Sequence, residues 1–121
     1  MSTRALFLLA VAAATGGAAK DPLAGRTPGP PTDCISLSQV TGGPTVTDDG
    51  AILYRESGRR IWRTTPVGTC PALRPDVTLI TEVYGGRLCR NDRFRVLEWN
   101  ATIPSEYCRF GAFTPYDKSG R

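Results

Sequence analysis

The segment Ala51-Ile52-Leu53-Tyr54-Arg55-Glu56-Ser57-Gly58-Arg59-Arg60-Ile61-Trp62-Arg63-Thr64 carries the strongest structural signal in the chain. Two runs of apolar, aromatic and charged residues flank Ser57-Gly58. A glycine in a two-residue loop can take the positive φ that tight hairpin turns require. The segment therefore predicts an antiparallel β-hairpin in which 51–56 pairs with 59–64.

A two-residue loop also fixes which residues face each other across this hairpin. The predicted pairs are Glu56 with Arg59, Arg55 with Arg60, Tyr54 with Ile61, and Leu53 with Trp62. Like charges placed directly opposite each other destabilise a sheet. We therefore expect Arg55 and Arg60 either to extend into water or to bind an anion.

Further short strands are expected at 34–40, which resumes at 45–47 after a break, and at 77–84, 87–89, 93–99 and 107–113, and Gly85-Gly86 predicts a second hairpin. No segment has the period of a convincing amphipathic helix. Six to seven short antiparallel strands within about eighty residues predict an all-β fold. The two candidate architectures are a small antiparallel barrel and a compact two-layer sheet.

The N-terminus has the organisation of a secretory signal peptide. Arg4 precedes an apolar run over 5–14, and small residues follow over 15–19. The run is too short to span a bilayer as a helix. We expect a signal peptide at 1–19, with cleavage after Ala19 or, as the alternative, after Ala14. The mature protein is then secreted, periplasmic if the source is bacterial, and has no membrane span.

The composition after the leader predicts three further parts. Residues 20–33 contain four prolines and two glycines but one large apolar residue, so we expect a disordered linker there. The β domain is expected over 34–116. A polar tail is expected over 117–121.

The four cysteines of an exported chain should form two disulfides. Four cysteines allow three pairings. Cys34 opens the patterned region and Cys108 nearly closes it, so topology favours a Cys34–Cys108 bond enclosing a Cys70–Cys89 bond. The sequential pairing of 34 with 70 and of 89 with 108 closes loops of similar entropy and stays an alternative.

Several kinds of chemistry are disfavoured by the residues present. The chain has no histidine, the usual base beside a serine or cysteine nucleophile. Its cysteines are not spaced as zinc ligands or as a redox pair, and no glycine-rich loop precedes a helix. We therefore expect no metal and no cofactor. A carboxylate hydrolase stays possible if the fold gathers acidic residues, the candidates being Asp48, Glu82, Asp92, Glu98 and Glu106. Asp48-Asp49-Gly50 is also the composition of an ordinary turn.

Arginines interleaved with aromatic residues form the remaining candidate site. The first cluster holds Arg55, Arg59, Arg60 and Arg63 around Trp62, and its predicted binding residues are Arg55, Arg60, Trp62 and Arg63. A second cluster holds Arg87, Arg90, Arg93 and Arg95 around Phe94. The planar guanidinium suits carboxylates and phosphates. The alternative interpretation of both clusters is that the arginines occupy exposed strand positions, where any polar residue is suitable, and bind nothing. The net charge of +4 is weak for a nucleic-acid binder, so no nucleic acid is expected.

The preferred function is a non-enzymatic binding module for an anionic envelope component or an acidic protein. An inhibitor or chaperone-like binder of an exported enzyme is the alternative, because a rigid disulfide scaffold limits the entropy lost on docking. A carboxylate-based hydrolase is less favoured than either.

Four sequence blocks resemble a known family. They are Asp33-Cys34-Ile35-Ser36-Leu37, the run 46–54, Gly68-Thr69-Cys70-Pro71-Ala72-Leu73, and Arg87-Leu88-Cys89. In this order they are similar to small exported proteins and lipoproteins, mainly of alphaproteobacteria, that are catalogued as a domain of unknown function. The resemblance covers about Asp33 to Phe113. It implies a periplasmic setting and a disulfide framework, and it brings no activity or catalytic residue. The chain lacks the acylated cysteine of the lipoprotein members.

Overall fold

The computed structural model describes residues 21–119, which form ten short β-strands and one 3-10 turn. The predicted signal peptide at 1–19 lies outside the described residues. The elements are β1 (Arg26–Pro28), β2 (Cys34–Ser36), η1 (Leu37–Gln39), β3 (Thr45–Val46), β4 (Ile52–Arg55), β5 (Arg60–Thr64), β6 (Thr78–Thr81), β7 (Arg87–Cys89), β8 (Arg93–Leu97), β9 (Cys108–Arg109) and β10 (Thr114–Lys118).

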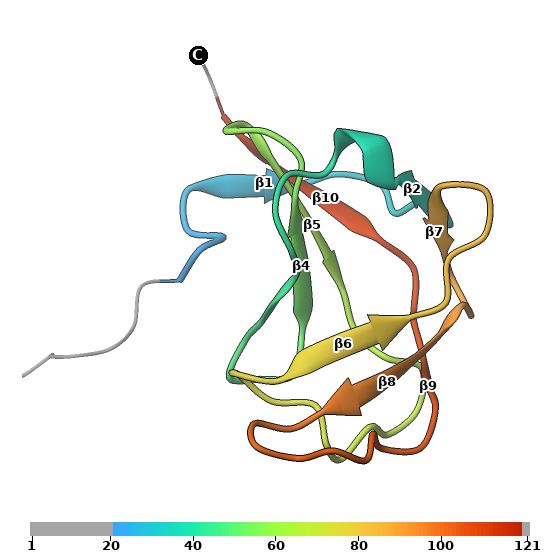
Figure 1. Ribbon diagram of the computed structural model, residues 1–121. Helices are drawn as coiled ribbons and strands as arrows, with labels where there is room; N and C mark the ends of the chain where they lie inside the picture. Colours follow the sequence, from blue (N-terminus) through green and yellow to red (C-terminus); the bar gives the residue numbers. More distant parts are fainter. Residues whose placement is uncertain (1–20, 120–121) are drawn as a thin grey trace, which may run out of the picture.

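These strands build three open antiparallel sheets, as Figure 1 shows. The largest has the order β1-β10-β5-β4-β3. A three-stranded sheet has the order β6-β8-β9, and β2 pairs with β7. The predicted all-β class and the compact-sheet architecture are confirmed. The barrel alternative is wrong, because each of the three sheets formed by residues 21–119 is open.

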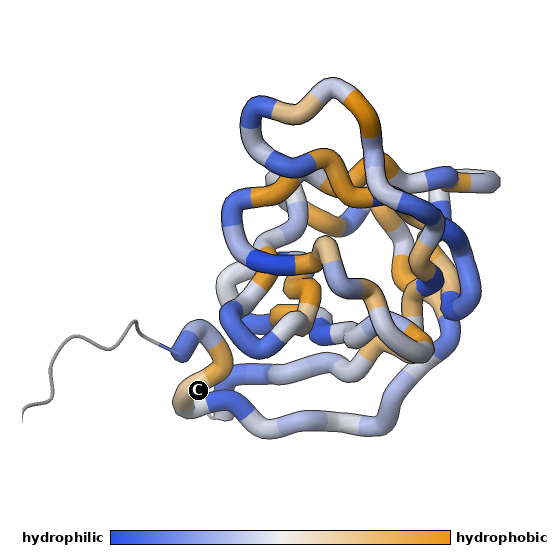
Figure 2. The backbone as a smooth tube through the Cα atoms, turned by 90° about the horizontal axis from the view of Figure 1, so that it is seen from below, coloured by the Kyte–Doolittle hydropathy of each residue, from blue (hydrophilic) through white to orange (hydrophobic). Residues whose placement is uncertain are grey.

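Aromatic residues from both larger sheets meet in the core. Phe94 of β8, Phe110 and Phe113 are fully buried. The ring centroids of Phe94 and Phe110 are 4.4 Å apart, and Tyr54 of β4 lies 6.4 Å from each of Phe110 and Phe113. In the hydropathy-coloured tube of Figure 2, hydrophobic segments of different strands lie close together inside the molecule. Aromatic pairs at these separations add to the free energy gained by burial.

The predicted hairpin forms, but its register differs by one residue. The observed pairs are Ile52 with Thr64, Leu53 with Arg63, Tyr54 with Trp62, and Arg55 with Ile61. Glu56 N donates to Arg60 O at 3.0 Å, so the loop contains Ser57, Gly58 and Arg59. The expected two-residue loop is therefore wrong. With three loop residues Tyr54 and Trp62 share the core face, and Arg55 no longer faces Arg60.

The second predicted hairpin exists only as a turn. Gly85 and Gly86 both have positive φ, 67° and 73°, as a tight hairpin turn requires. Tyr84 and Arg87 form a single bridge around it. The strands then separate, because β6 pairs with β8 and β7 pairs with β2.

Both ends of the expected domain extend further than the sequence indicates. β1 lies inside the predicted disordered linker, and β10 continues into the predicted polar tail. The two segments pair with each other, Arg26 opposite Lys118 and Thr27 opposite Asp117. A proline such as Pro28 is compatible with β1 because β1 is an edge strand. The linker and tail boundaries are thus wrong over these strands.

The disulfides join Cys34 to Cys89 and Cys70 to Cys108. Two disulfides were expected and are present, but the nested Cys34–Cys108 and Cys70–Cys89 pairing is wrong. The reason is the sheet topology. β2 pairs with β7, which places Cys34 directly opposite Cys89 with their Cα atoms 4.0 Å apart.

The double variant Cys70→Ala/Cys108→Ala should lose about 4 kcal/mol of unfolding free energy, the loop-entropy value for this bond. Urea unfolding of the variant and the wild type measures the difference. Cys34 and Cys89 should stay bonded in the variant. Two free thiols detected by mass spectrometry would contradict the observed pairing.

Candidate functional site

The alternation of side chains along β4 and β5 divides the four predicted binding residues between two faces. Residues that pair directly across antiparallel strands point to the same side. Tyr54 of the core face pairs with Trp62, so Trp62 and Arg60 belong to that inner face. Arg55 and Arg63 belong to the outer face. The structure therefore does not gather the predicted site into one cluster.

The inner-face arginine is held by its neighbours. Arg60 Nε donates to Asp117 Oδ1 at 2.7 Å and Arg60 Nη2 donates to Asp117 Oδ2 at 3.0 Å. The Arg60 guanidinium lies 5.2 Å from the ring centroid of Trp62, and Trp62 Nε1 donates to Glu56 Oε1 at 2.6 Å. These contacts occupy Arg60 and Trp62. The two residues stabilise the sheet and are not free to bind a ligand.

The same contacts shift two pKa values. The hydrogen bond from Arg60 lowers the pKa of Asp117 below its ordinary value of 3.8. The hydrogen bond to Asp117 raises the pKa of Arg60 in turn. Both shifts favour the charged pair. A bidentate arginine–carboxylate contact has this effect because both charged forms are hydrogen-bonded.

The outer face of the five-stranded sheet collects basic side chains. The observed register places Arg26, Arg55, Arg63 and Lys118 on this side, and the loop residue Arg59 lies beside Arg26 and Lys118; we call these five residues the basic face. Hydrogen bonds also hold three of these residues next to one another. Arg26 Nη1 donates to Arg59 O at 2.9 Å, and Lys118 N donates to the same oxygen at 2.9 Å. Glu56 and Asp117 point to the opposite face, whereas Asp49 lies on the basic face beside Arg63.

Arg55 lines a pocket of about 270 Å³ on the basic face. Its floor is apolar, with Leu53 and Ile61 4% and 1% exposed. Its rim holds Pro22, Thr41, Gly42, Gly43 and Thr45. No aspartate or glutamate lines it, and within residues 21–119 Arg55 forms no ion pair. Arg55 is thus an exposed cation beside a buried apolar surface.

Arg63 lines a larger neighbouring pocket of about 490 Å³ that also contains three carboxylates, those of Asp21, Asp48 and Asp49. Arg63 Nη2 lies 3.6 Å from Asp49 Oδ2. A hydrogen bond from Thr47, aided by Arg63, lowers the pKa of Asp49. The charge of Arg63 is therefore partly neutralised. Although this pocket is larger, its three carboxylates make it less favourable for an anion than the Arg55 pocket, which has none.

The five acidic residues considered for hydrolysis have different partners and line no common pocket in the described part of the chain. Asp48 lines the Arg63 pocket, whereas Glu106 lines a different pocket beside Cys108. Glu82 pairs with Arg93 at 3.1 Å, and Glu98 pairs with Arg74. The Asp92 carboxylate accepts a hydrogen bond from Cys89 N at 2.7 Å. These partners hold the carboxylates in ion pairs and turns, which does not suit the paired acid and base of a glycosidase.

The second predicted arginine cluster is organised around a different aromatic residue. Phe94 points into the core, so it is not part of a surface site. Arg93 and Arg95 lie 4.2 and 5.0 Å from the ring centroid of Tyr107, and Arg93 pairs directly with Arg109. Sequence reasoning missed Tyr107 and Arg109. The alternation at 107–109 is the signal that could have identified them.

In the described part of the chain, no helix has both the length and the apolar character needed to cross a membrane. Over the same residues no three histidine, cysteine, aspartate or glutamate side chains come together as possible metal ligands. The two disulfides fit an oxidising environment.

The fold and the site thus define a disulfide-linked all-β domain with a basic face. Comparisons with protein-family models, curated proteins and solved structures find no match for this chain. The family resemblance described above stays a prediction from the four sequence blocks.

The Arg60–Asp117 contact predicts a specific pH dependence. Because the pKa of Asp117 is lowered on folding, its stabilising effect is complete above pH 3.8 and is lost as the pH falls through the folded-state pKa. Asp117→Asn should lower the free energy of unfolding by about 0.5–1 kcal/mol at pH 7, and this difference should shrink as the pH falls through the folded-state pKa of Asp117. Chemical unfolding across this range measures the difference.

Asp76→Asn supplies the control, because Asp76 lies at an exposed position with φ of 72°, a conformation that asparagine adopts readily. An equal, pH-independent loss of unfolding free energy in the Asp117→Asn and Asp76→Asn variants would contradict the assigned role of Asp117.

Proposed function

We propose that this protein is a non-enzymatic binding module that docks an anionic partner on its basic face. The separation of charge by strand alternation supports this proposal. Five basic side chains lie on one side of the sheet, where Asp49 pairs with Arg63 alone, and the acidic residues Glu56 and Asp117 lie on the other side. Guanidinium groups bind carboxylates and phosphates through two parallel hydrogen bonds.

Arg55 is the observation that carries the proposal. A surface arginine that is already paired has little to gain from an anion, whereas Arg55 has no ion-pair partner within residues 21–119. It lies beside Leu53 and Ile61, which form an apolar wall. An apolar wall weakens the competition of water for the guanidinium and strengthens its attraction to an anion.

The proposed setting is extracytoplasmic. The predicted signal peptide and the two disulfides support export. In a bacterium the candidate partners are then anionic envelope components and acidic exported proteins. The net charge of +4 suits attraction to such partners, and it does not favour nucleic acid.

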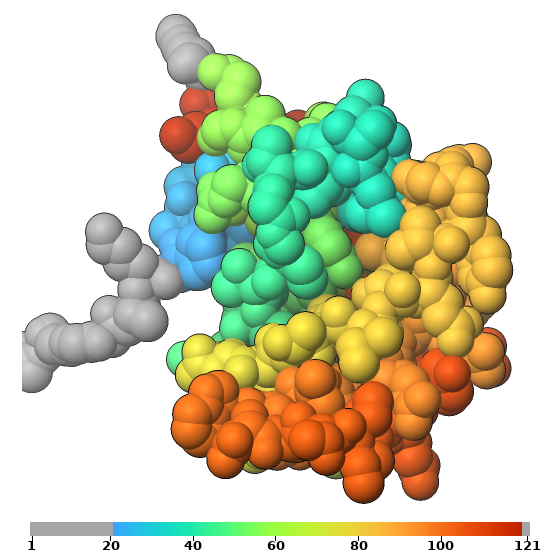
Figure 3. All heavy atoms as spheres, viewed as in Figure 1, coloured from blue at the N-terminus to red at the C-terminus, as the bar shows by residue number. Residues whose placement is uncertain are grey.

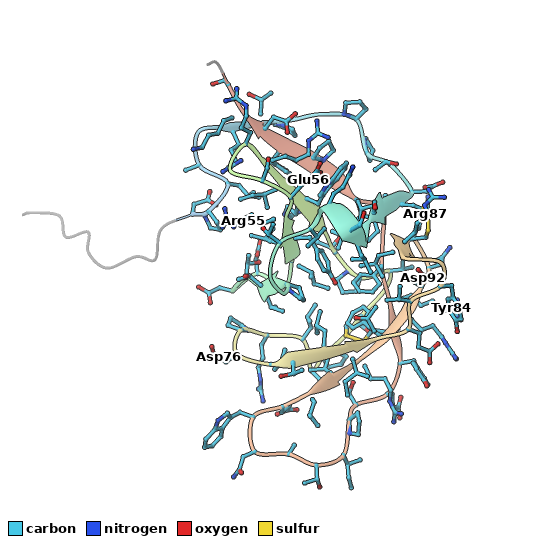
Figure 4. All side chains as sticks on the ribbon, turned by 45° about the horizontal axis from the view of Figure 1, so that its top comes forward. Arg55, Glu56, Asp76, Tyr84, Arg87 and Asp92 are labelled. Carbon is cyan, nitrogen blue, oxygen red and sulfur yellow. A yellow bond between two sulfur atoms is a disulfide. The ribbon has the colours of Figure 1, made fainter. Side chains whose placement is uncertain are left out.

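The proposal is tested by comparing Arg55→Ser with Arg87→Ser in binding to two anionic probes, phosphatidylglycerol vesicles and polyglutamate. Arg87 is exposed, forms no ion pair in the described residues and lies on the other side of the molecule, as Figure 4 shows. Both variants remove one positive charge. Arg55→Ser should weaken binding to at least one probe about tenfold, because a charge-assisted hydrogen bond is lost.

Arg87→Ser should change binding less than twofold, through net charge alone (about 0.4 kcal/mol). Salt titration should weaken binding of the wild type to the same probe. Equal effects of the two variants, or no binding to either probe, would contradict a site at Arg55.

A further inference from the structure

A second pocket of about 280 Å³ lies between the η1–β3 segment and strand β6. Most of its lining is apolar, and the side chains are those of Leu37, Val40, Pro44, Tyr54, Leu79, Thr81, Val83 and Leu88, with Gly42 at the rim. In Figure 3 the surface is hollowed between the teal η1–β3 segment and yellow β6. Burial raises the pKa of Tyr54, so its hydroxyl stays protonated. The pocket is therefore uncharged.

One wall of this groove is an open strand edge. β6 is the terminal strand of the three-stranded sheet and pairs only with β8. Glu82 N donates to Arg93 O at 3.1 Å, in the same register that pairs Thr78 with Leu97. Antiparallel strands direct alternate residues toward the partner. The backbone groups of Leu79 and Thr81, and of Val83 two residues beyond the end of β6, therefore point away from β8.

These edge groups lack backbone partners elsewhere in residues 21–119. They present N–H donors and C=O acceptors that repeat every second residue, a spacing of about 7 Å. A lipid headgroup or a phosphate offers acceptors but few donors. An extended peptide offers both at the matching spacing, which is how a strand adds to a sheet edge. The chemistry of the edge thus selects a peptide.

The apolar groove and the pocket of Arg55 share one lining residue. Gly42 lines both the apolar groove on the Tyr54 side of the hairpin and the Arg55 pocket on the opposite side, so a ligand that reaches both must pass around the segment at Gly42. No acidic side chain lines either pocket. A ligand that continues from the groove past Gly42 meets the positive charge of Arg55 with no carboxylate competing for it.

We propose that the groove binds an extended segment of a partner protein that adds a strand to the free edge of β6. An apolar side chain of the segment fills the pocket over Tyr54, and a carboxylate of the segment pairs with Arg55. The inference rests on the proposed anion site for its charged contact. The edge pairing and the apolar contact stand independently of Arg55.

The test uses the full exported chain and two synthetic probes, acetyl-Thr-Val-Thr-Leu-Thr-Asp-amide and the same peptide with Asn in place of Asp. Val83→Pro removes one outward N–H from the edge at a half-exposed position that forms no bond to β8. Val83→Ala is the matched control, because it shortens the same side chain and keeps the N–H. Val83→Pro should weaken binding of both peptides about tenfold, and Val83→Ala should weaken it less than threefold.

Amide chemical shifts and hydrogen exchange of the wild type provide a second measurement that does not depend on the folding of the proline variant. Peptide should protect the amides of Leu79, Thr81 and Val83. Protection elsewhere with none at these three amides, or equal binding by the two Val83 variants, would overturn the inference.

Arg55→Ser distinguishes this inference from the proposed function. The Arg55→Ser variant should bind the Asp peptide about tenfold more weakly than the wild type does, and it should bind the Asn peptide with unchanged affinity. If Arg55→Ser impairs binding to vesicles while neither peptide binds the wild type, the anion site stands and the peptide groove is refuted. If both peptides bind the β6 edge and Arg55→Ser changes nothing with any probe, the groove stands and the anion site is refuted.

Discussion

The register between β4 and β5 is the constraint on which the other features of this protein depend. Side chains alternate along a strand, so a shift of one residue moves every side chain to the opposite face. The observed register is maintained by Glu56, which accepts a hydrogen bond from Trp62, and by Arg60, which binds Asp117 of β10. These contacts link three neighbouring strands. They also engage the carboxylates of Glu56 and Asp117 on the inner face.

The same register determines the surface chemistry. Tyr54 and Trp62 turn toward the aromatic core, and Arg55 and Arg63 turn toward solvent. The basic face therefore follows from strand geometry and does not require an unusually basic chain, whose net charge is only +4. The two disulfides lie outside the five-stranded sheet. They join β2 to β7 and the Cys70 segment to β9, across the core from the basic face, and they fix the sheets that border the peptide groove.

Local patterns in the sequence predicted the all-β class, the hairpin at 51–64 and the presence of two disulfides. Features that depend on contacts between distant segments were not predictable in this way. The pairing of β1 with β10 joins two segments that are individually too rich in proline or too polar to be assigned as strands. The cysteine pairing follows from β2 meeting β7, and loop entropy could not select it. For the site, the sequence identified Arg55 and Arg63, whereas the loop length at Gly58 decided that Arg60 faces the other way.

Nuclear Overhauser effects between the Hα atoms of β4 and β5 test this register most directly. Glu56 and Arg60 form a hydrogen-bonded pair, so the intervening non-hydrogen-bonded pairs bring the Hα atoms close, and contacts are expected between Leu53 and Arg63 and between Arg55 and Ile61. Contacts between Leu53 and Trp62 or between Arg55 and Arg60 instead would show a register shifted by one residue. That result would move Arg60 and Trp62 to the other face and contradict the assignment of the basic face.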